Sequence, residues 1–158
     1  MTAVLLRKNL GGKLTVAKQQ DSGKRRWSDP SILTTIVNPT RQGYEIKIKN
    51  PELTFLGVKN QPDYAQVYMT FYPNEKVIEL KSLKQYFYQF RNSIISYERL
   101  INVVYDDIMK AYEPNRLRLT MLFNPRGGIS SKLTIDSDWT IRGGDEKFKD
   151  WVGQDDQW

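Results

Sequence analysis

Residues 64–73 have the sequence YAQVYMTFYP, and along this stretch apolar side chains alternate with more polar ones. Such period-two alternation is typical of a β-strand with one buried face and one wet face. The stretch GYEIKIKNP (43–51) shows the same pattern, because charged residues alternate with Tyr44, Ile46 and Ile48. Further strands are predicted at SILTTIVNP (31–39), which would pair with 43–51 through a turn, and at NRLRLTMLFNP (115–125) and SSKLTIDSDW (130–139).

Two helices are predicted between the third and fourth strands. The first begins near Ser82, and its apolar face carries Leu83, Tyr86, Phe87 and Phe90. The second, YERLINVVYDDIMKAY (97–112), has an apolar stripe at helical spacing and is stopped by Pro114. The order β-β-β-α-α-β-β predicts an α+β fold, an antiparallel sheet with two helices on one face. The edges of such a sheet can be protected by assembly of several subunits into a barrel.

Composition narrows the chemistry that the chain can perform. The 158 residues contain neither cysteine nor histidine. A disulfide framework, a thiolate nucleophile, a Cys/His zinc site and an imidazole base are therefore excluded, and no metal site is predicted. No apolar run approaches the roughly 18 residues that cross a bilayer, and the N-terminal apolar patch is too short for a secretory signal. We expect a cytoplasmic protein with no membrane partner.

The net charge of +6 lies at the N-terminus. Residues 1–28 hold seven basic groups and one acid, whereas residues 29–158 hold 17 of each sign. We interpret residues 1–28 as a basic, flexible leader and residues 29–158 as a single folded domain. The leader could neutralise the phosphates of a nucleic acid, or it could be a solvated extension that aids solubility. The neutral body is unlike a dedicated nucleic-acid platform.

Three motifs lie on this framework: QPD (61–63) before a strand, IELKSLKQYFYQFRN (78–92) opening a helix, and NPRGGIS (124–130) at the end of a strand. Together they resemble the 7-cyano-7-deazaguanine reductases, the NADPH-dependent nitrile reductases of queuosine biosynthesis. ELKSLK (79–84) matches a family motif, and QPDYA, FRN and PRGGI follow the family order between about residues 38 and 139. The resemblance implies a tunnelling fold, in which subunits of a homo-oligomer join their sheets into a barrel. Active sites then form between neighbouring subunits, and a glutamate binds the purine or pterin ring.

The resemblance also implies roles for individual residues. Glu98 stands at the place of the base-binding glutamate, and a carboxylate can accept two hydrogen bonds from a guanine-like edge. Tyr97 precedes it where the family has histidine, and Asp63 aligns with the proton donor. Ile78, Glu79 and Leu80 resemble the segment that borders the base pocket, and the NADPH contacts correspond to Lys81, Ser82, Lys84, Arg126 and Gly127. Alternatively, these side chains form a solvated helix face, a β-turn and a strand-start cap.

The chain departs from the family at the nucleophile. In the reductases a cysteine a few residues before the Pro-Asp pair attacks the nitrile, and Leu56 and Gly57 occupy that place here. Neither side chain can act as a nucleophile, so the covalent thioimide route is closed. Direct reduction with Asp63 polarising the nitrile remains open, with Lys59 as the nearest amine. The other hypotheses are a different reaction, such as amidine formation, and a non-catalytic binder of a deazapurine, purine or pterin that acts on tRNA or DNA.

Overall fold

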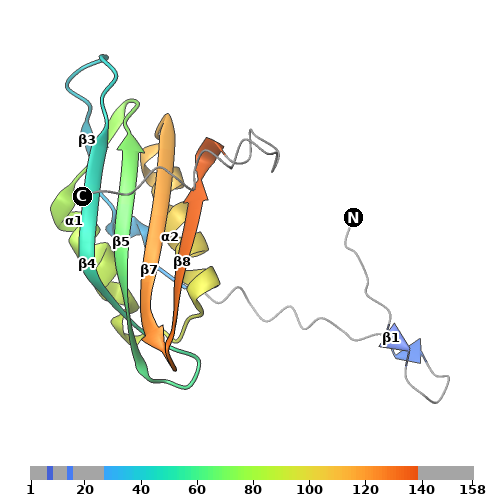
Figure 1. Cartoon of the computed structure of the whole chain (residues 1–158). Coiled ribbons are helices and arrows are strands. Elements are labelled where there is room, and N and C mark those ends of the chain that lie inside the picture. Colours follow the sequence, from blue (N-terminus) through green and yellow to red (C-terminus); the bar gives the residue numbers. More distant parts are fainter. Residues whose placement is uncertain (1–6, 9–13, 16–26, 139–158) are drawn as a thin grey trace.

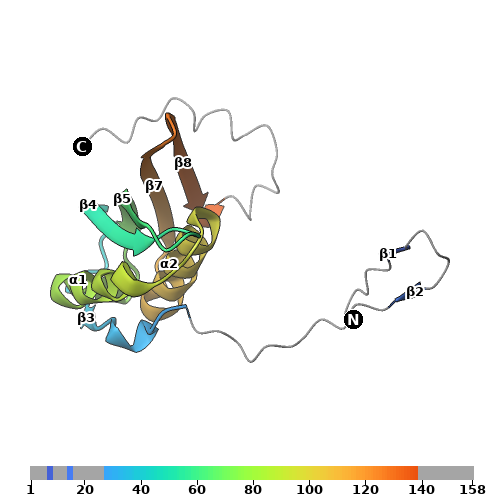
Figure 2. The ribbon, with the colours of Figure 1, turned by 90° about the horizontal axis from the view of Figure 1, so that it is seen from below.

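The computed structural model describes residues 7–8, 14–15 and 27–138. Its central feature is a four-stranded antiparallel sheet in the order β4-β5-β7-β8 (Figure 1). Helices α1 (Leu80–Tyr88) and α2 (Tyr97–Tyr112) lie on one face of that sheet (Figure 2). The predicted α+β arrangement is therefore confirmed. The strands are β4 (Ile46–Leu56), β5 (Pro62–Tyr72), β7 (Arg116–Arg126) and β8 (Ile129–Asp136).

The alternation in β5 determines which side chains form the core. Every second residue from Asp63 to Phe71 is buried, and the intervening residues face away from the helices. The apolar stripe of α2 covers this buried face, and the Phe71 ring meets the Tyr112 ring edge-on with 5.9 Å between centroids. Each large apolar side chain buried here contributes about 1.5–3 kcal/mol. The stripe consists of Leu100, Ile101, Val104, Ile108 and Tyr112.

Strand β4 is longer than the predicted 43–51 strand and contains a β-bulge. The pairing with β5 shifts between Asn50 and Leu53. Even-numbered side chains such as Ile48 face the helices before the shift, and odd-numbered ones such as Phe55 are buried after it. One extra residue on a strand has this effect on its faces. Pro51 is tolerated at the bulge because β4 is an edge strand.

The predicted hairpin between residues 31–39 and 43–51 is wrong. Residues 31–39 instead contribute to the 3-10 helix η1 (Pro30–Ile32) and to the short strand β3 (Thr35–Val37). β3 pairs with β6 (Lys76–Ile78), which lies between β5 and α1 in the chain. In the leader, β1 (Arg7–Lys8) pairs with β2 (Leu14–Thr15), and the rest of the leader up to residue 26 lies outside the described residues.

Capping interactions fix where the helices begin. The Glu79 carboxylate accepts hydrogen bonds from the backbone N–H groups of Lys81 (2.9 Å) and Ser82 (2.7 Å), and so caps α1. α1 thus begins two residues earlier than predicted and continues into the 3-10 helix η2 (Gln89–Asn92). Ser96 caps α2, which ends where Glu113 adopts a left-handed conformation before Pro114.

Residues 27 and 28 pack against α2, although they belong to the segment interpreted as the leader. The Ser28 hydroxyl donates to Asp107 Oδ2 (2.5 Å), which also accepts from the Tyr86 hydroxyl (2.7 Å). Burial, followed by the contact with Asp107, raises the pKa of Tyr86. The Arg99 guanidinium lies 5.0 Å from the centre of the Trp27 ring. In the part of the chain described, no helix is both long and apolar enough to cross a bilayer.

Candidate active site

A tight hairpin loop joins β4 to β5 and positions the QPD motif. The Gly57 N–H donates to the carbonyl of Gln61 (2.8 Å), and the Asn60 N–H donates to the carbonyl of Gly57 (2.8 Å). Asn60 adopts the left-handed conformation, with φ of 60°, that closes the loop. Lys59 is exposed in this loop. The loop brings Asp63 directly opposite Phe55 on β4, at the helix-covered face of the sheet.

The Asp63 carboxylate is buried, with only 4% of its side chain exposed. Its Oδ1 accepts from the backbone N–H of Tyr64 (2.9 Å), and its Oδ2 accepts from the Tyr97 hydroxyl (2.6 Å). The Nε of Arg126 lies 3.4 Å from the same Oδ2. A buried carboxylate requires such donors and an opposite charge. Asp63, Tyr97 and Arg126, which come from three separate parts of the sequence, therefore form one cluster.

Tyr97 is held by aromatic neighbours on two sides. Its ring stacks on Phe123 with 4.0 Å between centroids and an interplanar angle of 8°. Phe55 meets the same ring edge-on at 5.8 Å. Burial, the hydrogen bond to Asp63 and the negative charge of Asp63 together raise the pKa of Tyr97 to about 12. The hydroxyl therefore keeps its proton at neutral pH and remains a hydrogen-bond donor.

Arg126 lies over Gly57, at the place where the resemblance puts the nucleophile. A Cβ on residue 57 would come within 2.6 Å of Arg126 Nη1. The Nη2 group donates to the Gln61 side-chain oxygen (3.2 Å). The guanidinium therefore occupies the space beside the β4–β5 loop that a side chain at residue 57 would otherwise fill. The β7–β8 turn beyond it uses Gly127 and Gly128 in the left-handed region, with φ of 56° and 79°.

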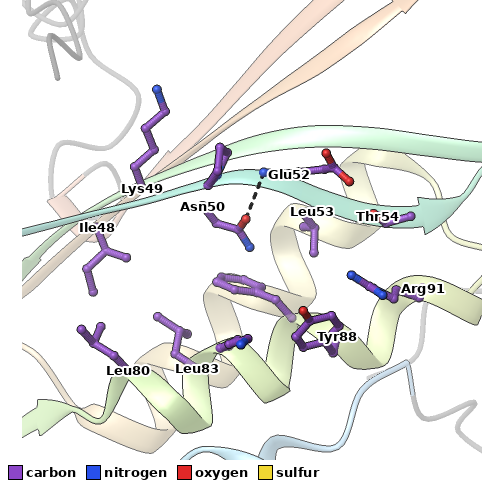
Figure 3. A pocket seen from close by; sticks show the side chains of 13 residues that line it. Ile48, Lys49, Asn50, Glu52, Leu53, Thr54, Leu80, Leu83, Tyr88 and Arg91 are labelled. Carbon is purple, nitrogen blue, oxygen red and sulfur yellow. Dashed lines mark hydrogen bonds between the residues drawn. The ribbon is translucent and has the colours of Figure 1, made fainter.

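A hollow lies between β4 and α1, apart from the Asp63 cluster (Figure 3). It has a volume of about 390 Å³, and its floor is apolar, with Leu53, Leu83 and Phe87 among its lining residues. Lys49, Lys84 and Arg91 add three positive charges to the lining, Glu52 adds a negative one and Tyr88 adds an aromatic ring. The Arg91 guanidinium lies 4.1 Å from the centre of the Tyr88 ring. We call this hollow the β4–α1 groove.

Two of the predicted site residues, Leu80 and Lys84, line the groove. Lys81 is exposed, whereas Ser82 is buried, and its hydroxyl accepts from the Thr34 N–H and donates to the carbonyl of Glu79. The structure does not bring these residues to Arg126. In Figure 3, Leu80 faces Ile48, nine residues before Gly57, and nine residues of strand span roughly 25–30 Å.

The residues predicted to bind the base are also separated within one chain. Glu98 is exposed in the first turn of α2. Glu79 accepts a hydrogen bond from the Thr34 hydroxyl, and the Thr34 carbonyl accepts one from Tyr112 at the other end of α2. Fourteen helical residues span roughly 20 Å. Glu98 and the segment Ile78–Leu80 thus lie at opposite ends of α2.

Comparison with known proteins places the chain in a family. A family model described as "QueF-like protein" matches residues 62–142. A protein named NADPH-dependent 7-cyano-7-deazaguanine reductase from Prochlorococcus marinus strain AS9601 is 38% identical over 131 residues, which cover 78% of this chain and 96% of that protein. The chain belongs to the QueF-like family. The resemblance predicted from the motifs is thereby confirmed.

Other QueF-like relatives agree. A protein of the same name from Gloeobacter violaceus is 44% identical over 100 residues, which cover 61% of this chain and 72% of the relative. Among solved structures, the crystal structure of the archaeosine synthase QueF-Like in the apo form matches with a TM-score of 0.55 and 16% identity. That match covers 59% of this chain and 92% of the solved chain, and it supports the fold.

Several residues of both sites were given no role from the sequence, although Gln61 and Arg91 lie within the quoted motifs. Gln61 orients Arg126, and Phe55 and Phe123 hold the Tyr97 ring. Tyr88 and Arg91 line the β4–α1 groove, and their spacing of three residues at the end of a helix was the available signal. Among the residues that the structure describes, no group of three histidine, cysteine, aspartate or glutamate side chains could hold a metal ion.

Proposed function

We propose that the protein is an NADPH-dependent oxidoreductase that reduces 7-cyano-7-deazaguanine to 7-aminomethyl-7-deazaguanine. Relatives that bear the reductase name match most of the chain. The observation that carries the proposal is the buried Asp63 carboxylate, held by Tyr97 and Arg126 inside the region that the QueF-like family model matches. An acid group fixed at the end of the sheet can exchange a proton with a bound substrate.

The reaction proceeds here without covalent capture of the nitrile. The chain has no cysteine, so a thioimide cannot form. The remaining groups at this place are the Tyr97 hydroxyl, the Asp63 carboxyl and the Arg126 guanidinium. Hydrogen-bond donors directed at the nitrile nitrogen stabilise the negative charge that develops on it during reduction. Lys59 is the nearest amine and is exposed in the β4–β5 loop.

Glu98 is the proposed base-binding residue. It follows Tyr97 in the first turn of α2, and its exposed carboxylate can accept two parallel hydrogen bonds from the N–H and exocyclic amine of a deazaguanine. Tyr97 directly precedes Glu98 in the sequence, and its hydroxyl donates a hydrogen bond to Asp63. A base bound at Glu98 would therefore direct its substituent toward Asp63.

The β4–α1 groove fits part of NADPH. Cations beside an aromatic ring suit a dinucleotide, because guanidinium and ammonium groups bind phosphates and tyrosine rings stack on bases. Lys84 and Arg91 would hold phosphate groups and Tyr88 would contact a ring, with Lys81 nearby on α1. When bound, NADPH supplies the hydride. A ring held against the apolar floor of the groove would lose contact with water there.

The proposed site combines residues from neighbouring subunits of a homo-oligomeric barrel. Glu98 lies roughly 20 Å from the segment Ile78–Leu80 along α2, and Arg126 lies roughly 25–30 Å from the start of α1 along β4. Both separations suggest that the two halves of the site meet across a subunit interface. A barrel also protects the sheet edges at β4 and β8.

The decisive experiment measures NADPH oxidation by the purified protein with 7-cyano-7-deazaguanine, together with calorimetric binding of the same base. We expect turnover, and we expect Glu98→Gln to weaken base binding by about 1.5–3 kcal/mol, the range for hydrogen bonds to a charged group. Binding without turnover would favour the second hypothesis, a non-catalytic deazapurine binder. That hypothesis gains support from the basic leader if the protein also binds tRNA or DNA. Failure to bind the base at all would refute both.

A further inference from the structure

The β4–α1 groove has a chemistry that matches one segment of the same chain. Residues 150–158 (DWVGQDDQW), called here the acidic segment, carry three carboxylates, two tryptophan rings and no basic group. We propose that the acidic segment docks in the β4–α1 groove of its own chain and competes there with the dinucleotide. The docking is independent of the reaction, whereas the competition rests on the proposed function, because it requires NADPH to bind in the same groove.

The groove presents apolar surface that the described part of the chain leaves open. Leu80 is 62% exposed and Tyr88 is 45% exposed, and both line the hollow (Figure 3). Leu83 and Phe87 continue this surface into the floor. Exposed apolar side chains that gather at a hollow mark a binding surface. An indole ring suits such a surface, because each large aromatic side chain can bury about 150–250 Å².

The charge of the groove is opposite to that of the acidic segment. Lys49, Lys84 and Arg91 line the groove together with one glutamate, so its lining has a net charge of +2. The three aspartates give the acidic segment a charge of −3. The Arg91 guanidinium and the Lys84 ammonium lie 4.1 Å and 5.8 Å from the centre of the Tyr88 ring. Carboxylates can therefore pair with these cations while a neighbouring indole packs on the apolar surface.

The acidic segment follows β8 closely enough to reach the groove. Asp136 at the end of β8 pairs with Arg118 on β7. Arg118 pairs with Thr70 on β5, and Thr70 pairs with Lys47 on β4. The end of β8 is therefore level with Lys47, next to Ile48 at the start of the groove, and three strand spacings away, roughly 14–15 Å. The eleven residues before the acidic segment can span up to roughly 36–40 Å, which is enough to pass around the edge of the sheet at β4.

Attachment to the same chain allows a weak contact to fill the groove. A segment tethered near its site has an effective concentration on the order of 1 mM. An intrinsic Kd of about 0.1 mM would then fill the groove in about nine of ten molecules. Because only the remaining molecules could bind a dinucleotide, the apparent Kd for NADPH would rise about tenfold.

A pair of introduced cysteines tests the docking directly, because the chain has none of its own. Leu80→Cys with Gln154→Cys places one thiol at the groove and one within the acidic segment. The control pair is Ile129→Cys with Gln154→Cys, because Ile129 is 77% exposed and lies at the start of β8, away from the groove. The control positions are closer in sequence, so chain length alone favours closure of the control pair.

The assay is disulfide formation under oxidised glutathione, followed by intact mass. In the native protein we expect the groove pair to close at least about tenfold faster than the control pair, and in urea we expect the order to reverse. Asp155→Asn with Asp156→Asn should slow the groove pair at least about threefold. Equal native rates for the two pairs, a rate that the asparagines leave unchanged, or a disulfide between two copies would overturn the inference.

Calorimetry with NADPH separates the docking from the proposed function. Asp155→Asn with Asp156→Asn should tighten NADPH binding about three- to tenfold. Asp145→Asn with Glu146→Gln removes the same charge outside the acidic segment and should leave the affinity within about twofold. If the groove pair closes fast and NADPH does not bind, the docking stands and the proposed function fails. If NADPH binds equally well to the wild type and to the asparagine variant, the competition is refuted while the proposed function stands.

Discussion

Removing one oxygen atom from Tyr97 tests the reasoning on the Asp63 cluster. The substitution Tyr97→Phe deletes the hydroxyl that donates to Asp63 Oδ2 at 2.6 Å. The phenylalanine ring keeps the stacking on Phe123 at 4.0 Å and the edge contact with Phe55 at 5.8 Å. The change therefore isolates the hydrogen bond from the packing of the ring.

The expected loss follows from the surroundings of Asp63. A hydrogen bond to a charged group contributes about 1.5–3 kcal/mol to stability. Arg126 and the Tyr64 N–H still hold the carboxylate in the variant, so the loss should lie near the lower limit. We expect the free energy of unfolding at pH 7 to fall by about 1.5–2 kcal/mol. The melting temperature of a chain of this size should then fall by about 3–8 °C.

Urea unfolding at pH 7 and pH 11 measures this effect, with Tyr68→Phe as the control. The Tyr68 hydroxyl bonds to the neutral Gln66 side chain on the other face of the sheet, so its loss should cost less than about 1 kcal/mol. The raised pKa of Tyr97 means that its contribution is complete below pH 10 and is lost as the pH rises toward 12. The difference between Tyr97→Phe and wild type should therefore narrow at pH 11. Equal losses for the two variants at pH 7 would refute the assignment.

Three other outcomes are expected. Leu56→Cys should restore covalent capture, so incubation with 7-cyano-7-deazaguanine should raise the intact protein mass by the mass of the base. The same gain of mass in Val58→Cys, whose residue is exposed in the loop, would argue against a specific site. Arg91→Ala should weaken NADPH binding, measured by calorimetry, about 10- to 100-fold. Lys47 pairs with a glutamate, so an equal loss of affinity in Lys47→Ala would indicate a nonspecific charge effect. Glu79→Ala should destabilise α1 and lower the melting temperature. Because the backbone N–H groups of Lys81 and then Ser82 lower the pKa of Glu79, the difference in melting temperature from wild type should close as the pH falls below 4.5. A difference that does not depend on pH would contradict the capping role.

A strand was predictable where apolar and polar residues alternate without interruption along its whole length. Strand β5 alternates without interruption, and its predicted extent agrees closely with the structure. The prediction of β4 ended at Pro51, because proline lacks the N–H group that a central strand needs. In the structure the bulge shifts the buried face by one residue, and the strand continues to Leu56. A search for one uninterrupted alternation of buried and exposed residues cannot recognise a strand whose buried positions shift by one residue part-way along it.

The pairing of residues 31–39 could not be predicted, because it depends on contacts distant in sequence. The short turn at 40–43 favoured a hairpin with 43–51. The structure instead pairs Thr35 with Ile78, just before α1, where Ser82 also accepts a hydrogen bond from the Thr34 N–H. The pairing therefore joins residues more than 40 positions apart in the sequence.

The individual residues of the candidate site were predicted, but their contacts with one another were not. The family resemblance implied separate roles for Asp63, Tyr97 and Arg126, and it grouped Arg126 with two lysines. The contact between Arg126 and Asp63 arises because the end of β4, the start of β5 and the end of β7 meet at one end of the sheet, beside the first turn of α2. No spacing in the sequence encodes that meeting point. The assignments of Glu98, Lys81 and the remaining contacts stay predictions.

The contact between Trp27 and Arg99 gives the protein an optical reporter next to the proposed base site. Trp27 lies against Arg99, which immediately follows Glu98 in the first turn of α2. Indole emission responds to the position of a nearby charge, so movement of that turn should change the colour and intensity of Trp27 fluorescence. Replacing Trp139, Trp151 and Trp158 by phenylalanine would leave Trp27 as the single emitter. Base binding could then be followed in real time without a label.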